Sequence, residues 1–111
     1  MIQSRFPTRI TAVSNAVVLI GGNGELTFTS QNAALSASGA YVVRAEIAAS
    51  ATVCAEVRPY AIIVPNDVYD FGGAEFDALA RDIGAGLVVV PSTVQLGVLA
   101  ALLSEEALRL G

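Results

Sequence analysis

The chain has 111 residues, enough for one domain with a hydrophobic core and too few for two. Its net charge of −4 and sequence pI near 4.5 exclude the basic patch that nucleic-acid binding requires, so no nucleic acid is expected as a partner. No apolar run approaches the ~20 residues that span a bilayer, and the first residues lack the order of a signal peptide. We therefore expect a cytoplasmic protein with no membrane partner.

Side chains that carry reactive chemistry are scarce in this sequence. Histidine is absent, all six basic residues are arginine, and Cys54 is the single cysteine. Without histidine, neither a Ser-His nor a Cys-His pair can form, and the imidazole metal ligand is missing. Cys54 lies in an apolar, helix-like segment, which favours a small buried hydrophobe over a reactive thiol. We expect no catalytic residue, no metal and no cofactor.

The first half of the chain contains one firm strand and one ambiguous segment. Residues 1–8 are expected to form a flexible arm, and residues 9–13 are either a short strand or the approach to the apolar strand of residues 16–20. After Gly21-Gly22-Asn23-Gly24, residues 25–29 have strand propensity and, with Asn23-Gly24, indicate a β-hairpin. The alternative is a helix over residues 25–38 with Gly39 as its C-terminal cap, which the wider pattern favours.

The second half alternates regularly between strand and helix. Strands are predicted over residues 40–45, 60–64 and 87–90, with a helix near residues 49–56. A loop from Asn66 to Gly73 leads into a helix ending at Ile83, and Thr93 is expected to cap a final helix that extends to about Leu110. This alternation predicts a single α/β domain over residues 1–111: an open, mostly parallel sheet of about four strands flanked by helices, flavodoxin-like and truncated.

Three stretches together resemble a response-regulator receiver domain. Residues 35–45 (LSASGAYVVRA) are similar to the end of that family's first helix and its second strand. Residues 58–64 (RPYAIIV) resemble the entry into its third strand, and residues 66–76 resemble the turn into its third helix. The resemblance covers roughly residues 16–92. It implies a receiver fold shortened by about one βα unit, because only one strand and one helix follow Ile83.

The same resemblance implies that the family's phosphorylation chemistry is lost. The acidic pair that holds magnesium falls on Gly21 and Gly22, and the phosphoacceptor aspartate falls on Pro65. The lysine that precedes a proline falls on Val90, before Pro91. Since aspartyl phosphorylation needs a carboxylate nucleophile and an oxygen site for Mg²⁺, the resemblance implies a pseudo-receiver with a degenerate pocket, and not an enzyme.

Other polar motifs have simpler explanations than chemistry. The loop of residues 21–24 lacks the Lys-Ser/Thr of a Walker loop, and no last glycine completes a dinucleotide fingerprint after it, which favours a plain turn. Ser92 and Thr93 have no base to activate them. A solvated acidic rim explains four carboxylates better than a calcium loop does: Asp67, Asp70, Glu75 and Asp77.

The final helix is the strongest candidate for an interaction surface. Its first three turns leave little polar surface, which is typical of a helix buried on every side. One face is expected to pack on the sheet, and another to meet a protein partner or a second copy of the chain. The predicted interaction face consists of Val94, Leu96, Val98, Leu99, Leu102 and Leu103.

These observations favour a non-enzymatic, phosphorylation-independent interaction or dimerisation module of a signalling or regulatory system. Two alternatives remain open. One is an α/β domain that binds a nucleotide or another anion through the loops of residues 21–24 and 66–70. The other is a structural subunit that assembles through strand edges, as the hairpin alternative implies.

Overall fold

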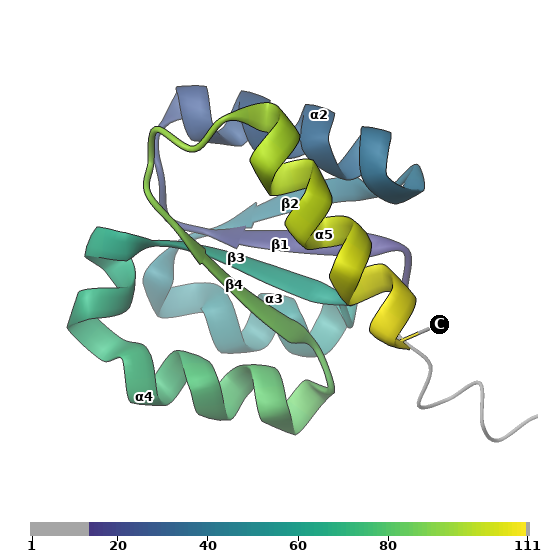
Figure 1. Cartoon of the computed structure of the whole chain (residues 1–111). Coiled ribbons are helices and arrows are strands. Elements are labelled where there is room, and N and C mark those ends of the chain that lie inside the picture. The colour runs from purple at the N-terminus through teal and green to yellow at the C-terminus, as the bar shows by residue number, and fades with distance from the viewer. Residues whose placement is uncertain (1–13, 111) are drawn as a thin grey trace, which may run out of the picture.

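Four parallel strands form one open sheet with helices on both faces (Figure 1). This computed structural model describes residues 14–110, so the predicted arm and the possible strand of residues 9–13 lie outside the described residues. The strands are β1 (Ala16–Ile20), β2 (Tyr41–Ala45), β3 (Ala61–Pro65) and β4 (Gly86–Val90). The helices are α2 (Gly24–Ser38), the 3-10 turn η2 (Ile47–Ala49), α3 (Ser50–Val57), α4 (Asn66–Ile83) and α5 (Leu96–Leu110). The predicted α/β fold class is confirmed.

The strand order β2-β1-β3-β4 places the two fully buried strands in the centre of the sheet. Every residue of β1 and β3 is buried, which explains why both strands read as continuous apolar runs. In β1, Val17 and Leu19 belong to the core on one face, and Val18 and Ile20 belong to the core on the other. The edge strand β2 is more exposed, because only one neighbour covers its backbone.

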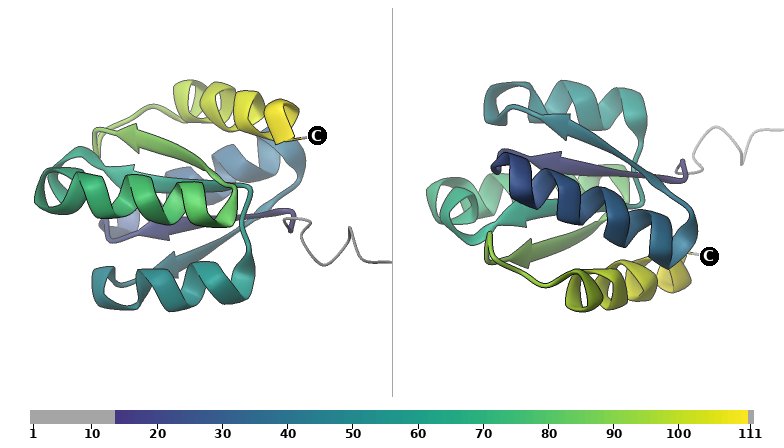
Figure 2. Two further views of the ribbon diagram at one scale, coloured as in Figure 1. Left: turned by 90° about the horizontal axis from the view of Figure 1, so that it is seen from below. Right: turned by 90° about the horizontal axis from the view of Figure 1, so that it is seen from above.

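The two faces are covered by different pairs of helices. Helices α2 and α5 lie side by side over one face, whereas α3 and α4 cover the other (Figure 2). Each pair encloses its own hydrophobic core, separated from the other by the sheet. No helix in the described part of the chain is long and apolar enough to cross a membrane.

The ambiguous segment after β1 is a helix, as the wider pattern predicted, and not a hairpin strand. The side chain of Asn23 accepts a hydrogen bond from the backbone N–H of Leu26 at 2.8 Å, which caps the first turn of α2. At the other end, Gly39 adopts a left-handed conformation, and its N–H group bonds the carbonyl of Leu35. Asn23 and Gly24 therefore begin a helix here, and the next strand returns parallel to β1.

Two predicted boundaries are wrong. The segment from Asn66 to Gly73 is not a loop, because α4 begins directly after Pro65 and is interrupted only at Gly72, where φ is −154° and ψ is 43°. Thr93 does not cap the final helix. Residues 91–94 form a turn in which the N–H of Val94 bonds the carbonyl of Pro91 at 3.0 Å, and α5 starts at Leu96.

Candidate functional site

The carboxyl ends of β1 and β3 bring three of the predicted site residues together. A Cβ built on Gly22 would lie 3.7 Å from Cγ of Pro65, and one built on Gly21 would lie 3.1 Å from a methyl group of Val68. Both glycines have positive φ, 73° and 85°, a conformation that side chains disfavour. Val90 pairs with Pro65 in the sheet register, so Val90 and the adjoining Pro91 share this edge.

Arg44 brings a positive charge to this edge. The guanidinium of Arg44 donates a hydrogen bond to the carbonyl of Gly22 at 3.0 Å and forms an ion pair with Glu46 at 2.8 Å. With the N-terminal turn of α2, Arg44 makes the edge mildly favourable for negative charge, although Glu46 offsets much of that effect. Among the described residues, no group of three or more His, Cys, Asp or Glu side chains is arranged to hold a metal ion.

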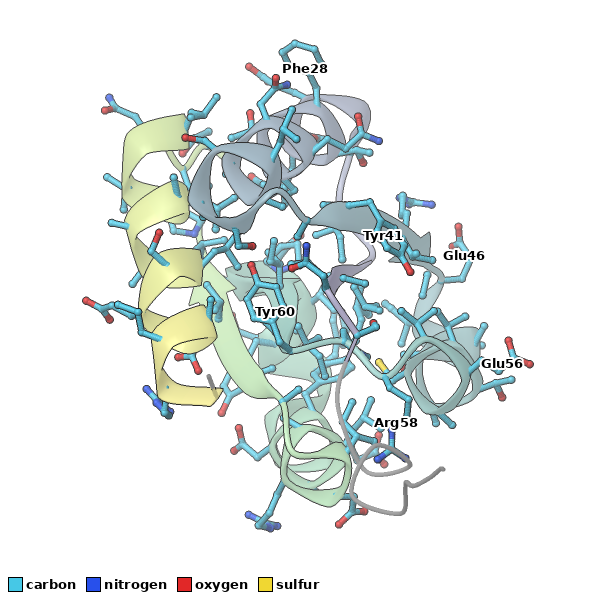
Figure 3. All side chains as sticks on the ribbon, turned by 90° about the vertical axis from the view of Figure 1, so that its right-hand side faces the viewer. Phe28, Tyr41, Glu46, Glu56, Arg58 and Tyr60 are labelled. Atoms are coloured by element: carbon cyan, nitrogen blue, oxygen red, sulfur yellow. The ribbon has the colours of Figure 1, made fainter. Side chains whose placement is uncertain are left out.

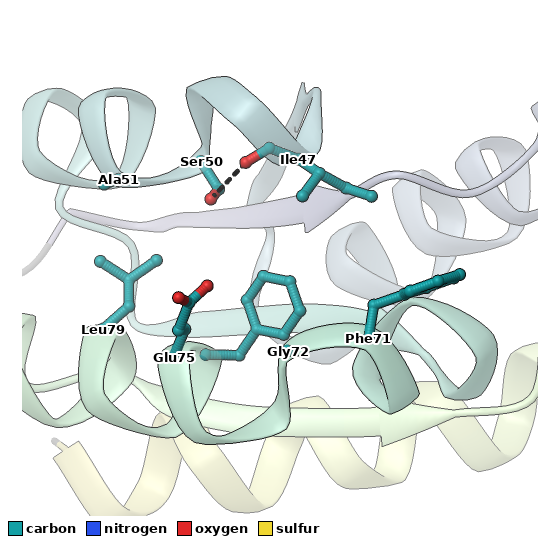
Figure 4. A pocket seen from close by; sticks show the side chains of 8 residues that line it. Ile47, Ser50, Ala51, Phe71, Gly72, Glu75 and Leu79 are labelled. Carbon is teal, nitrogen blue, oxygen red and sulfur yellow. Dashed lines mark hydrogen bonds between the residues drawn. The ribbon is translucent and has the colours of Figure 1, made fainter.

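A groove opens beside this edge, between α3 and α4 (Figure 4). It has a volume of about 330 Å³ and apolar walls made by Ile47, Ala51, Phe71, Phe76 and Leu79. Its polar lining comes from Ser50 and Glu75. We call this cavity the α3–α4 groove.

The most unusual side chain of the groove is Phe71. It is 89% exposed, more than any other large hydrophobic residue identified as exposed in the described part of the chain. Ile47, on the opposite wall, is 50% exposed, whereas Phe76, which also lines the groove, is buried. The groove therefore has a buried apolar floor and an exposed aromatic side chain at its mouth.

The shape of α4 explains why Phe71 is exposed. Gly72 is non-helical and divides the helix, so the residue before it does not follow the apolar stripe of the second segment. A tyrosine links the two segments across this break, because the hydroxyl of Tyr69 donates to the carboxylate of Asp77 at 3.0 Å. A Cβ on Gly73 would lie 2.8 Å from the ring of Tyr69, so this position accommodates only glycine without a shift.

Asp77 also changes the acidity of this tyrosine. The hydrogen bond from the phenol to the carboxylate raises the pKa of Tyr69, and desolvation and the negative charge of Asp77 act in the same direction. The phenol therefore keeps its proton at neutral pH and remains a hydrogen-bond donor to Asp77.

The acidic cluster of α4 is on the surface, as the sequence predicted. All four of its carboxylate residues are exposed, and only Glu75 lines the groove. Cys54 is fully buried in the core between the sheet and α3, and burial raises the pKa of its thiol from 9.0 to about 11. The cysteine is therefore the inert hydrophobe that the sequence indicated.

The predicted interaction face on α5 is not one surface. Leu99 and Leu103 are fully buried in the core beneath α2 and α5, so these two residues cannot contact a partner. Val94 and Leu102 are partly buried against the same core. Only Leu96 and Val98, at the start of the helix, are exposed.

Sequence reasoning missed the α3–α4 groove. The segment from Asn66 to Gly73 was predicted to be a loop, and an aromatic residue in a loop carries no periodic signal. The one available clue was the order Phe71-Gly72-Gly73, an aromatic residue directly before two residues that break helices.

No family model matches the sequence, and no curated protein matches it. Among solved structures, the fold is similar to the lactose-specific IIB component domain of the phosphoenolpyruvate:carbohydrate phosphotransferase system from Streptococcus pneumoniae. The TM-score is 0.52 at 18% sequence identity, and the match covers 86% of this chain and 94% of that one.

This match corrects the receiver resemblance, which is wrong. The matched stretches were mainly apolar strands followed by Gly- and Pro-containing turns, a pattern common to many parallel α/β sheets. Because the match covers 94% of the IIB chain, no βα unit is missing relative to that fold. The interpretation of Gly21, Gly22, Pro65, Val90 and Pro91 as a receiver's lost phosphorylation pocket loses its basis.

The expectation that the chain is not an enzyme is contradicted as well. It rested on the pseudo-receiver assignment and on the lack of an acid–base or nucleophilic constellation in the sequence, whereas the structural neighbour is a component of a phosphotransferase system. What the comparison establishes for this chain is the architecture: a four-stranded parallel α/β domain of the kind seen in a IIB component.

Proposed function

We propose that this chain is a component domain of a multiprotein phosphotransfer system, and that it acts there by binding another protein in the α3–α4 groove. The first part of the proposal is supported by the fold, which a component of such a system shares. The second part comes from the groove, and the observation that carries it is the 89% exposure of Phe71 beside a buried apolar floor.

Energetic considerations favour a protein as the ligand of the groove. Keeping a phenylalanine in water sacrifices about 1.5–3 kcal/mol that its burial would provide. Aromatic side chains at the rim of an apolar pocket are typical of the central contacts of protein interfaces. The volume of about 330 Å³ is at the lower end of the range for ligand pockets and suits an anchoring side chain of a partner.

Site-specific photo-crosslinking tests the docking site. A photoreactive benzoylphenylalanine replaces Phe71 in one variant and Phe28 in a matched control. Phe28 is 67% exposed on α2, on the opposite side of the sheet, and points away from the ribbon (Figure 3). We expect one protein to be captured through position 71 and not through position 28. Capture of the same protein at both positions would contradict the proposal.

A groove-filling variant makes the crosslinking result specific. Ala51 is an exposed residue of α3 that lines the groove, so Ala51→Arg places a long side chain inside it without disturbing the core. We expect this variant to melt at the wild-type temperature and to lose the crosslink through position 71. A crosslink that survives Ala51→Arg would show that the partner contacts Phe71 without entering the groove.

The phosphotransfer part of the proposal has a separate test. The chain and the captured protein are purified and incubated together with radiolabelled phosphoenolpyruvate, and in parallel with labelled ATP. Label on either protein that depends on the presence of the other supports a phosphotransfer component. A stable complex in which neither protein takes up label would remove that part of the proposal and leave the docking part standing.

A further inference from the structure

Helix α4 forms one wall of the α3–α4 groove and is called its rim here, and before Arg81 this helix carries charge of a single sign. Between Asn66 and Ala80 the only charged residues are the four carboxylates Asp67, Asp70, Glu75 and Asp77. All four are exposed, and Glu75 lines the groove itself. Phe71 lies between Asp70 and Glu75 in the sequence, so the exposed aromatic side chain is flanked by negative charge on the same helix.

Basic residues do not neutralise this rim within the described part of the chain. The two ion pairs found there join Arg44 to Glu46 and Arg109 to Glu106, and neither involves α4. Arg81, in the last turn of α4, follows the groove-lining stretch. Asp77 accepts a hydrogen bond from Tyr69, which leaves Asp67, Asp70 and Glu75 as carboxylates for which the structure gives no cationic partner.

We propose that the groove binds a protein segment in which a large apolar side chain is flanked by arginine or lysine residues. This inference rests on the proposed function and specifies the chemistry of its partner. The apolar side chain fills the cavity between Phe71, Phe76 and Leu79, and the cationic groups pair with the carboxylates of the rim. An acidic or neutral apolar segment would fill the same cavity but would be repelled by the rim or would gain nothing from it.

Peptide titrations of the isotope-labelled full chain test the chemistry directly by NMR. The probe has the sequence Arg-Arg-Leu-Phe-Arg-Arg, one control replaces every arginine by glutamate, and a second control replaces Leu and Phe by serine. We expect only the first peptide to shift the backbone amide signals of Ile47, Ala51 and residues 72–79. These shifts should weaken as salt rises from about 0.05 to about 0.5 M, because surface charges are then screened.

The contrary results are equally specific. If the glutamate peptide shifts the same amides as strongly, the rim has no influence on selection and the inference is wrong. If the arginine peptide without Leu and Phe binds as well as the probe, the rim acts as a non-specific cation surface and the apolar groove is not the site. Shifts confined to α2 and α5 would also overturn the inference.

Charge-removing variants separate this inference from the proposed function. Asp70→Asn and Glu75→Gln should each raise the Kd for the crosslinked partner about two- to fivefold, the effect typical of an exposed ion pair. The matched control is Asp82→Asn, which removes an exposed carboxylate near the end of the same helix and should leave the Kd unchanged.

If Phe71→Ala weakens partner binding while Asp70→Asn and Glu75→Gln do not, the docking proposal stands and the inference of a basic partner is wrong. If Phe71→Ala has no effect, the docking proposal itself fails.

Discussion

On one face of the sheet, α2 and α5 pack directly against each other, and Leu99 and Leu103 of α5 are fully buried beneath them. On the other face, α3 has only eight residues and α4 is broken at Gly72, so the two helices leave a groove with Phe71 at its mouth. Both faces expose some apolar side chains, such as Phe28 and Leu108 on the first and Phe71 on the second. We call the first face sealed because its two helices pack on each other over the core, and the second open because a groove separates its helices. A high apolar content therefore does not show by itself which surface is available to a partner.

The largest expected difference in the free energy of unfolding is between alanine variants of two phenylalanines on α4. Phe76 is 6% exposed and Phe71 is 89% exposed. Phe76→Ala should lower the free energy of unfolding by about 3–5 kcal/mol. Phe71→Ala should change it by less than about 0.5 kcal/mol. Urea denaturation followed by circular dichroism measures both. Similar losses in the two variants would mean that Phe71 is buried in solution and that this face is sealed like the other.

The sealed face is tested by a pair of leucines on α5. Leu99 is fully buried, so Leu99→Ala should cost about 2–5 kcal/mol of stability through lost contacts and a residual cavity. Leu108, on the same helix, is 81% exposed, and Leu108→Ala should be close to neutral. The same denaturation experiment gives both values. A near-neutral Leu99→Ala would show that α5 is not anchored in the core.

A smaller loss of stability is expected at the carboxyl ends of the central strands, where Gly22 lies. Gly22→Ala places a side chain on a residue with φ of 85° and brings its Cβ to 3.2 Å from a methyl group of Leu26. We expect a loss of about 1–2 kcal/mol, mainly from the left-handed backbone. Gly24→Ala is the matched control, because a Cβ there meets no atom within 4 Å and the residue has no positive φ. Equal effects of the two changes would rule out backbone strain as the cause.

The pH dependence of stability reports on the core under the open face. Burial raises the pKa of the Cys54 thiol to about 11 from 9.0, so the folded state holds a proton that the unfolded chain releases first. The stabilising effect of the buried, protonated thiol is complete below about pH 9 and is lost as the pH rises towards 11. The difference in stability between wild type and Cys54→Ala should therefore shrink over that window.

Thiol labelling is the matching control for solvent access. We expect a thiol reagent such as dithiobis-nitrobenzoate to leave Cys54 unmodified in the folded protein at pH 8 and to modify it fully in urea. Rapid labelling of the folded protein would show that solvent reaches the core through the groove. The groove would then have no buried floor.

The sequence predicted the architecture better than the surface. Continuous apolar runs at residues 16–20 and 60–64 indicated buried central strands, and Gly39 marked the C-terminal end of α2, whereas Asn23-Gly24 indicated a hairpin and instead begins the helix. These signals are local, because a cap or a buried strand depends on adjacent residues. Strand order, in contrast, depends on which apolar surfaces meet, and no short segment specifies it.

Two residues of the predicted interaction face on α5 lie in the core for the same reason. Leu99 and Leu103 were assigned to a partner because α5 is apolar on all sides, yet α2 covers them within the domain. Phe71 was overlooked because its exposure results from a helix break at Gly72 and from the short length of α3 on the neighbouring wall. Neither cause is visible in the apolar periodicity of a single helix.

The measurement that tests the central claim most directly is the affinity of the crosslinked partner for Phe71→Ala and Phe28→Ala, by isothermal titration calorimetry. The two variants remove the same side chain from the open and from the sealed face. We expect the Kd to rise about 10- to 100-fold for Phe71→Ala, as for a central aromatic contact, and less than about twofold for Phe28→Ala. Equal affinities for both variants and the wild type would contradict the assignment of the α3–α4 groove as the docking site.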